Sequence, residues 1–200
     1  MCQICFISMS SRANINALNL ACWNINGLFH RGIQYSKLKD DEFIKLKCDI
    51  DILGLVEMHS KDDDCLNIPN YKAVVRHRSK ANSIKPSGGI AVFYKDHLHG
   101  GIKIDRLSSD FVIWLRLCKD FFCLDSDNIL GTVYLPPENS HNAKIAGVDI
   151  TEKLENDIRV LSANSRLILM GDFNGRTRVE SDHIPYDSAR FIPSVENIYI

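Results

Sequence analysis

"RLILMGDFN", residues 166–174, joins a nearly continuous apolar run to an acid and an amide that stand two positions apart. A short apolar run of this kind is typical of a strand that is covered on both faces. In extended backbone, the side chains of Asp172 and Asn174 would point the same way. An aspartate can accept a proton from an attacking water, and an amide can donate to a phosphate oxygen. The stretch therefore predicts a buried strand that ends in two candidate catalytic residues.

A plain turn is the alternative interpretation of the same residues. Asp and Asn both favour turns, and Gly171 and Gly175 flank them in the sequence. The motif by itself leaves both interpretations open, so its meaning depends on what the rest of the chain places beside it.

The stretch just before this strand predicts a helix. In "DITEKLENDIRVLSAN" (149–164) the apolar residues recur at spacings of four, four and three, at Ile150, Leu154, Ile158 and Leu161. This is the pattern of an amphipathic helix, and Asp149 or Thr151 could cap its start.

The first part of the chain predicts a strand, a helix and a second strand. "LNLACWNIN" (18–26) alternates apolar and polar residues until Gly27 breaks the pattern. "SKLKDDEFIKLKC" (36–48) has loose helical spacing, with Ser36 as a plausible N-cap. "DIDILGLVEMH" (49–59) is a near-continuous apolar run, as in a strand buried on both faces. This order predicts a βαβ unit.

Short segments rich in Val, Ile and aromatic residues fill the middle of the chain, at 71–78, 88–95, 111–118 and 128–135. No long helix separates them, so we expect antiparallel pairing. The whole pattern is mixed α/β and favours two packed sheets with helices outside. We expect residues 1–14 to form a loose, disordered leader and residues 15–200 to form one domain.

Composition limits the possible partners. The 200 residues carry a formal net charge of −1, so no global basic field would draw the chain to nucleic acid. A local patch could still do so, and the candidate is Arg76, His77, Arg78, Lys80 and Lys85, with a merely solvated loop as the alternative. No apolar run approaches the roughly 20 residues of a membrane-spanning helix, so we expect no membrane partner. Seven scattered cysteines favour a reducing, intracellular compartment over a disulfide scaffold.

Polar residues follow several of the predicted strands, where binding sites tend to be built. Glu57 ends one apolar run and would suit a hard cation, Mg²⁺ or Mn²⁺, although an ordinary strand-end acid is the alternative. Asn24 and Asn26 repeat the spacing of Asp172 and Asn174, and a turn before Gly27 is again the alternative. A fourth predicted strand ends in Tyr134, whose phenol could reach the same edge.

Five motifs in this order give the chain a family resemblance: "CWNINGL", "LGLVEMH", "GGIAVFY", "GTVYLPP" and "ILMGDFN". Together they resemble the endonuclease/exonuclease/phosphatase superfamily, which includes deoxyribonuclease I and abasic-site endonucleases. The match covers about residues 16–176. Abasic-site enzymes carry an acid at the place of Asn26, so the chain is most similar to the endonuclease domain of non-LTR (LINE-type) retrotransposons.

The resemblance implies a four-layer α/β–β/α sandwich of the deoxyribonuclease I type and metal-dependent hydrolysis of phosphodiesters. It implies that Glu57 binds the metal, Mg²⁺ or Mn²⁺, and that Asn24 helps to hold Glu57, the metal and the phosphate. Asp172 would orient or deprotonate the attacking water, while Asn174 and Tyr134 would contact the scissile phosphate.

The sequence departs from the family pattern near its end. The family's sandwich continues past the motif of Asp172 with further strands, a late aspartate and a final Asp-His pair. The sequence ends at Ile200, so we expect the C-terminal strands of the sandwich to be missing from it. Ser181, Asp182 and His183 have the letters of the final motif. They follow too soon for the intervening strands, so we expect His183 to be a loop residue and not the catalytic histidine.

Three functions stay open at this point. The first is a Mg²⁺-dependent endonuclease of retroelement type that nicks DNA, with a reverse transcriptase further along the parent element. The second is a phosphatase or phosphodiesterase of the same superfamily, acting on inositol phosphates or lipids. The third is a catalytically incomplete fragment that binds metal or nucleic acid without turnover. A DNA-nicking enzyme should reach the nucleus, but the sequence has no clear basic targeting run, so its location stays unpredicted.

Overall fold

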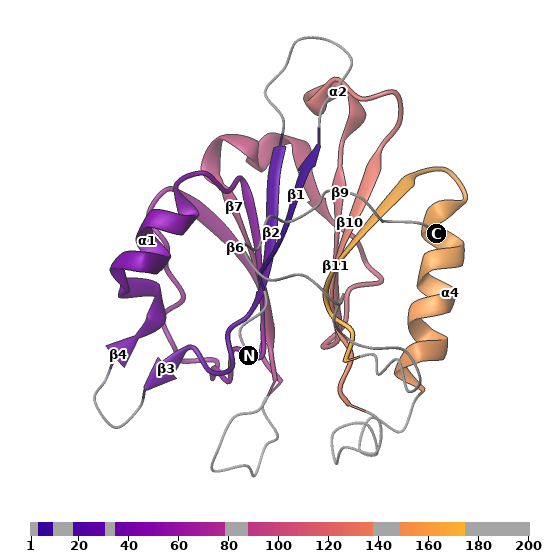
Figure 1. Ribbon diagram of the computed structural model, residues 1–200. Coiled ribbons are helices and arrows are strands. Elements are labelled where there is room, and N and C mark those ends of the chain that lie inside the picture. Colours follow the sequence, from indigo (N-terminus) through magenta and orange to yellow (C-terminus); the bar gives the residue numbers. More distant parts are fainter. Residues whose placement is uncertain (1–3, 10–17, 31–34, 79–87, 138–148, 175–200) are drawn as a thin grey trace, which may run out of the picture.

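Two sheets packed face to face form the centre of the molecule in the computed structural model, which describes residues 4–9, 18–30, 35–78, 88–137 and 149–174. Helix α1 (Asp41–Lys47) lies outside one sheet and helix α4 (Ile150–Ser162) outside the other, so the described residues stack in four layers (Figure 1). The predicted α/β sandwich with helices outside is thereby confirmed. His183 and the rest of residues 175–200 lie outside the described residues.

The first sheet has the strand order β1-β2-β5-β7-β6. Its members are β1 (Ile4–Met9), β2 (Leu18–Asn24), β5 (Ile52–Val56), β6 (Tyr71–Arg76) and β7 (Ile90–Lys95). The neighbours β2 and β5 run parallel, and α1 connects them as the predicted βαβ unit requires. The other neighbours pair antiparallel.

One difference from the sequence analysis concerns the leader. Ile4–Met9, expected to be loose, instead form strand β1, which pairs with β2 over all six of its residues. Pairing with β2 gives the backbone donors and acceptors of this short apolar run the partners that an isolated leader would lack.

The second sheet has the strand order β11-β10-β9-β8. Its members are β8 (Ile102–Ile104), β9 (Val112–Leu117), β10 (Asn128–Tyr134) and β11 (Arg166–Asp172). The neighbours β10 and β11 run parallel on either side of α4 in the sequence, while β9 pairs antiparallel with both β8 and β10. The antiparallel pairing predicted for the middle of the chain is therefore correct in both sheets.

Short elements connect these layers. A two-stranded ribbon of β3 (Phe29–His30) and β4 (Tyr35–Ser36) leads into the 3-10 helix η1 (Lys37–Lys39). A second 3-10 helix, η2 (Asp96–Gly101), follows β7, and the single turn α2 (Lys119–Phe122) follows β9. The predicted cap Asp149 is in place on α4, where its Oδ1 accepts from the Thr151 amide at 2.9 Å. Ser36 caps η1 and not α1: its Oγ accepts from the Leu38 amide at 3.3 Å, whereas α1 begins after Asp40, whose side chain makes no cap hydrogen bond.

Three apolar clusters hold the four layers together. The largest lies between the two sheets and includes Leu20, Ile52, Val92, Leu115 and Leu130. A second fills the space between the first sheet and α1, and a third lies between the second sheet and α4. Every residue of β5 and of β10 is buried, which agrees with apolar runs that lack alternation. Among the described helices, none is both long and apolar enough to cross a bilayer.

Tyr71 at the start of β6 gives a prediction about pH. Its phenol oxygen lies 2.6 Å from the Lys47 carbonyl oxygen and 2.5 Å from that of Ile50. Burial, followed by the nearby Asp51 carboxylate, raises the pKa of Tyr71 to about 12. Between roughly pH 10, the ordinary pKa of tyrosine, and that value, the unfolded chain loses this proton while the folded chain keeps it. Folding stability therefore falls as the pH rises across this window.

In the Tyr71→Phe variant, the part of the loss of folding stability at high pH that comes from this phenol should be absent. We expect the variant to be less stable than the wild type by about 1 kcal/mol at pH 8, where the phenol hydrogen bond is intact. The difference in free energy of unfolding between the wild type and the variant should be smaller at pH 11 than at pH 8. Urea unfolding followed by circular dichroism at both pH values measures this, and a difference that stays constant would contradict the assignment.

Candidate functional site

The carboxyl ends of four strands meet at one edge of the sandwich. In the first sheet, Asn24 pairs with Val56 in the parallel register of β2 and β5, so Asn24 stands beside Glu57. In the second sheet, Tyr134 pairs with Asp172 in the parallel register of β10 and β11. Parallel neighbours end at the same edge of a sheet, and the packing of the two sheets brings the two edges together (Figure 1).

Two side-chain hydrogen bonds cross from one sheet to the other at this edge. Asn24 Nδ2 donates to Asp172 Oδ2 at 2.6 Å, although the two residues are 148 positions apart. The Tyr134 phenol donates to Glu57 Oε1 at 2.5 Å. The structure therefore brings Asn24, Glu57, Tyr134 and Asp172 together at one edge as two hydrogen-bonded pairs, and the catalytic roles of these residues stay a prediction.

After three of these strands, β2, β5 and β11, the chain passes through a residue in the left-handed backbone region. The φ angles are 43° at Asn26, 55° at Glu57 and 44° at Asn174. Asn24 Oδ1 accepts from the Asn26 amide at 3.0 Å, and Asp172 Oδ1 accepts from the Asn174 amide at 2.9 Å. These are the local bonds of Asx turns, so Asn24 and Asp172 shape the turn at their own strand end as well as the contact across the sheets.

This geometry corrects the expectation that Asp172 and Asn174 share one extended segment. Strand β11 ends at Asp172, and Gly171 lies inside the strand and not in a turn. The Asn174 amide nitrogen Nδ2 donates to the Leu135 carbonyl at 2.8 Å. Asn174 is therefore held beside the end of β10, near Tyr134, by its turn and not by strand alternation. Gly175 lies outside the described residues.

Glu57 is held in its strained conformation by the loops on both sides. The Gly27 amide donates to the Glu57 carbonyl at 2.7 Å, and the Met58 amide donates to the Gly89 carbonyl at 3.3 Å. Met58 itself is fully buried, so it anchors the segment next to Glu57. A left-handed conformation at a residue with a side chain costs about 1–3 kcal/mol and persists only where the surroundings impose it. Such positions are common at functional sites, which makes Glu57 a residue to test.

Two titratable groups of the site have shifted pKa values. Burial raises the pKa of the Tyr134 phenol, and its hydrogen bond to Glu57 adds to the rise, while the charge of Arg78 opposes it. The phenol therefore stays protonated, and able to donate, throughout the neutral range. Burial also lowers the pKa of His59, an effect that the Glu57 carboxylate opposes and the charges of Arg78 and Lys37 reinforce.

Two cations lie at this edge although the sequence reasoning did not place them there. Lys37 Nζ donates to the Ile25 carbonyl at 2.6 Å and so holds the turn that follows Asn24. The Arg78 guanidinium carbon lies 5.3 Å from the centre of the Tyr134 ring. Arg78 is part of the basic cluster that was expected to form a surface patch or a solvated loop. No sequence signal separates it from its neighbours, because its position depends on a contact with a strand of the other sheet.

Two other residues of that basic cluster make contacts of their own in the described part of the chain. His77 Nδ1 lies 3.0 Å from Ser60 Oγ, and Arg76 Nη1 lies 3.5 Å from the Val75 carbonyl. Both side chains are half-buried. Lys80 and Lys85 lie outside the described residues.

The donor set of the edge fits a hard divalent cation bound in part by water and phosphate. Among the described residues, no three or more His, Cys, Asp or Glu side chains are grouped so that they could hold a metal ion, so these residues offer no all-protein cage. Mg²⁺ in proteins is commonly held by one or two carboxylates with several waters and a substrate phosphate. Glu57 and the amide oxygen of Asn24, side by side at the ends of β5 and β2, match that pattern.

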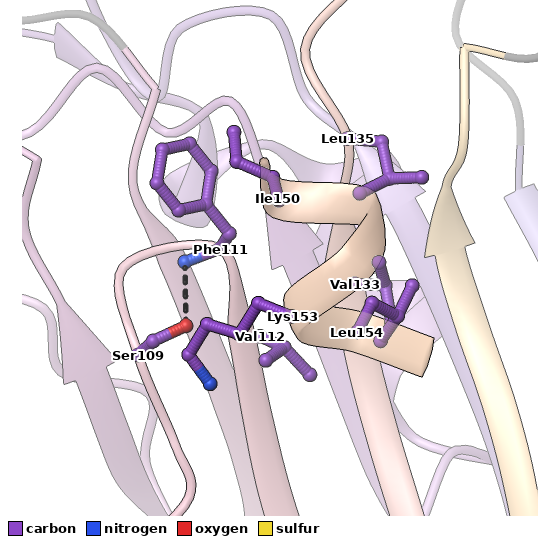
Figure 2. A pocket seen from close by; sticks show the side chains of 8 residues that line it. All are labelled: Ser109, Phe111, Val112, Val133, Leu135, Ile150, Lys153 and Leu154. Carbon is purple, nitrogen blue, oxygen red and sulfur yellow. Dashed lines mark hydrogen bonds between the residues drawn. The ribbon is translucent and has the colours of Figure 1, made fainter. Parts of the chain in front are cut away.

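A small pocket lies between the first turn of α4 and the ends of β9 and β10 (Figure 2). Of the eight described residues that line it, only Lys153 is charged, and its Nζ lies 2.8 Å from Asp157 Oδ2. The pocket therefore offers an apolar wall and no free charge for a phosphate. It borders the candidate site through Phe111 and Leu135, but on the α4 side of the second sheet.

Comparisons with known proteins found likenesses in structure only. No family model matches the sequence, and no curated protein matches it. The solved structures that are similar to the chain include the following three. The catalytic domain of human Nocturnin with bound sulfate has a TM-score of 0.49 and 17% identity, over 80% of this chain and 64% of that one. An AP endonuclease from Archaeoglobus fulgidus has a TM-score of 0.49 and 17% identity, over 78% of this chain and 57% of the endonuclease chain.

The third is a variant of the 3′ phosphatase NExo from Neisseria, bound to a product DNA hairpin. It has a TM-score of 0.43 and 19% identity, over 78% of this chain and 57% of the NExo chain. The chain thus spans 57–64% of the length of these three structures. At such identities and TM-scores the likeness by itself says nothing about the activity of this chain, which has to be argued from its own residues.

Proposed function

We propose that this chain belongs to the endonuclease/exonuclease/phosphatase superfamily and hydrolyses phosphodiesters with the help of a divalent metal, Mg²⁺ or Mn²⁺. The observation that carries the proposal is the pair of hydrogen bonds across the sheets, Asn24 to Asp172 and Tyr134 to Glu57. Four polar residues from strands far apart in the sequence, all named by the family motifs, converge on one edge. Four independent turns would have no reason to do so.

The finer proposal is a DNA endonuclease of the LINE-type retroelement branch. The sequence "CWNINGL", with Asn26 where abasic-site enzymes carry an acid, supports that branch. DNA is then the substrate, and a reverse transcriptase would be encoded further along the parent element. No observation among the described residues favours inositol phosphates or lipids as substrates.

The residues have distinct parts in this proposal. Glu57, with Asn24 beside it, would hold the metal, which when bound would offset negative charge on the phosphate and on the leaving oxygen. Asp172 would accept a proton from the attacking water as the water oxygen bonds to phosphorus. The P–O bond to the leaving nucleoside then breaks, and that oxygen takes a proton from solvent. Asn24 holds the Asp172 carboxylate in place at 2.6 Å.

Phosphate contacts would fall to Asn174 and Tyr134. One N–H of the Asn174 amide is used on the Leu135 carbonyl, which leaves the second N–H to donate to a phosphate oxygen. The Tyr134 phenol donates to Glu57 in the structure and would transfer this hydrogen bond to the phosphate when substrate is present.

Metal dependence tests the proposal directly. The 200-residue chain should convert supercoiled plasmid to the nicked form in Mg²⁺ and should stop when EDTA is added. Glu57→Gln removes the carboxylate charge, so we expect half-maximal nicking to need roughly 10–100 times more Mg²⁺. Glu155→Gln, on the exposed face of α4, is the matched control and should behave as the wild type.

Two outcomes would count against this proposal. If nicking persists in EDTA, the activity does not need a divalent metal. If the folded chain binds plasmid but never nicks it under any Mg²⁺ or Mn²⁺ concentration, this chain is a nucleic-acid-binding fragment without turnover.

A further inference from the structure

Arg78 occupies an unusual place next to the candidate site. Its guanidinium carbon lies 5.1 Å from the centre of the Phe111 ring and 5.3 Å from that of Tyr134. Both distances are within the range of cation–π attraction, so the ring of Tyr134 in β10 and the ring of Phe111, just before β9, hold a cation from the segment that follows β6. One of these rings belongs to the tyrosine that donates to Glu57.

The two terminal nitrogens of Arg78 have no hydrogen-bond partner among the described residues. Both Nη1 and Nη2 are buried, and neither makes a hydrogen bond. Glu57 Oε1 accepts from Tyr134 and both oxygens of Asp172 accept from asparagines, and none of these bonds involves Arg78. Arginine stays charged at any working pH, so the cost of these buried donors cannot be relieved by losing a proton. A partner from outside the chain would relieve it.

The backbone beside Arg78 is shaped to accommodate the planar group. A Cβ at Gly88 would lie 2.3 Å from Arg78 Nη2, so no residue with a side chain fits there without moving the guanidinium. Gly88 also has a φ of +71°, and its carbonyl accepts from the His59 amide at 2.8 Å. The same glycine therefore makes room for Arg78 and fixes the loop that carries Glu57.

We infer that Arg78 is an oxyanion-binding residue whose partner is a phosphate group of the substrate, an inference that rests on the proposed function for the source of that phosphate. The planar fork of Nη1 and Nη2 matches two oxygens of one phosphate. Its place on the Tyr134 ring puts that phosphate at the strand edge of Glu57 and Asp172. Because both nitrogens are buried, neighbouring groups must move aside before an oxyanion can reach them. The experiment therefore measures directly whether phosphate binds.

Binding of inorganic phosphate to the 200-residue chain is the measurement, by isothermal titration and by the shift in thermal unfolding midpoint. We expect saturable binding to the wild type and binding roughly 10–100 times weaker in Arg78→Met, which keeps most of the stem and loses the fork. Arg78→Lys should fall between them, because it keeps the charge without the two-pronged geometry. Arg106→Met, at an exposed position, is the matched control and should bind phosphate as the wild type does.

If Arg78→Met does not fold, two measurements still decide. Arg78→Lys should bind phosphate more weakly than the wild type, and NMR signals of the Arg78 guanidinium protons should shift when phosphate is added. Unchanged phosphate binding in either folded variant, or guanidinium signals that ignore phosphate, would overturn the inference.

The inference and the proposed function can fail separately. Phosphate binding that depends on Arg78, in a chain that never nicks plasmid, would keep the oxyanion site and reject the nuclease. Plasmid nicking that depends on Mg²⁺, with phosphate binding unchanged in Arg78→Met, would keep the nuclease and reject the oxyanion site.

Discussion

Asp172→Asn is expected to lower the rate of plasmid nicking by roughly 10²- to 10⁴-fold, the usual contribution of a positioned general base. The substitution preserves the size of the side chain. In the wild type, Asp172 accepts from Asn24 Nδ2 at 2.6 Å and from the Asn174 backbone amide at 2.9 Å. The amide oxygen of the variant can still accept one of these two hydrogen bonds. What the variant cannot do is take a proton from water. The loss should therefore appear in kcat, with little change in the plasmid concentration needed for half-maximal rate.

The matched control for this experiment is Asp120→Asn. Asp120 lies on the exposed turn α2, at the opposite end of the sandwich from the candidate site (Figure 1), and its substitution removes the same unit of charge. We expect this variant to nick at the wild-type rate, and circular dichroism should show that both variants are folded. If Asp172→Asn nicks within about twofold of the wild type, Asp172 is not the base, and the edge of the sandwich needs another assignment.

Much of the fold could be predicted from local sequence patterns. The apolar run at 49–59 and the helical spacing at 149–164 correspond to β5 and α4. A strand buried on both faces leaves a continuous apolar run, whereas an amphipathic helix leaves apolar residues every three or four positions. The parallel pairing of β2 with β5 follows from the helix between them. These features depend on residues close together in the sequence, and such residues are what a pattern can report.

Strand β1 shows what such patterns do not report. Its apolar letters, "ICFISM", lack alternation and have no turn signal before them, so they look like a loose start of the chain. What makes them a strand is a partner: they extend the exposed edge of β2. Pairing at a sheet edge is a contact between segments, and a single short segment carries no record of it.

The candidate site divides in the same way. Its polar residues were visible in the sequence because each follows an apolar run, and the family motifs named the same positions. The contacts that join them were not visible, since the Asn24–Asp172 bond connects residues 148 positions apart. The place of Arg78 was hidden for the same reason, because the two rings that it contacts, Phe111 and Tyr134, lie far from it in the sequence.

Gly171→Ala tests whether β11 holds the site together, and we expect it to destabilise the fold by about 2–6 kcal/mol, adding about 1–3 kcal/mol of backbone strain to about 1–3 kcal/mol of overpacking. A Cβ at Gly171 would lie 1.9 Å from the carbonyl oxygen of Val133, its register partner on β10. Neither atom belongs to a flexible side chain, so the strands themselves would have to separate. The φ of Gly171 is +151°, a conformation that side chains rarely adopt.

Gly27→Ala separates the strain from the clash. Gly27 also has a positive φ, +85°, but the nearest atom to a Cβ there is His59 Nδ1 at 3.4 Å, an ordinary contact. Gly27→Ala should therefore cost only the strain, about 1–2 kcal/mol. Urea unfolding of both variants beside the wild type measures the two costs. If Gly171→Ala costs no more than Gly27→Ala, β11 can move away from β10 freely.

The same substitution links stability to the site. Asp172 follows Gly171 directly, and its carbonyl accepts from the Leu135 amide at 2.9 Å. A strand pushed off Val133 would carry Asp172 away from Tyr134, its register partner, and would lengthen the bond from Asn24. We therefore expect any folded fraction of Gly171→Ala to nick plasmid far more slowly than Gly27→Ala at equal folded concentration. Equal rates would mean that the pairing of β11 with β10 does not set the position of Asp172.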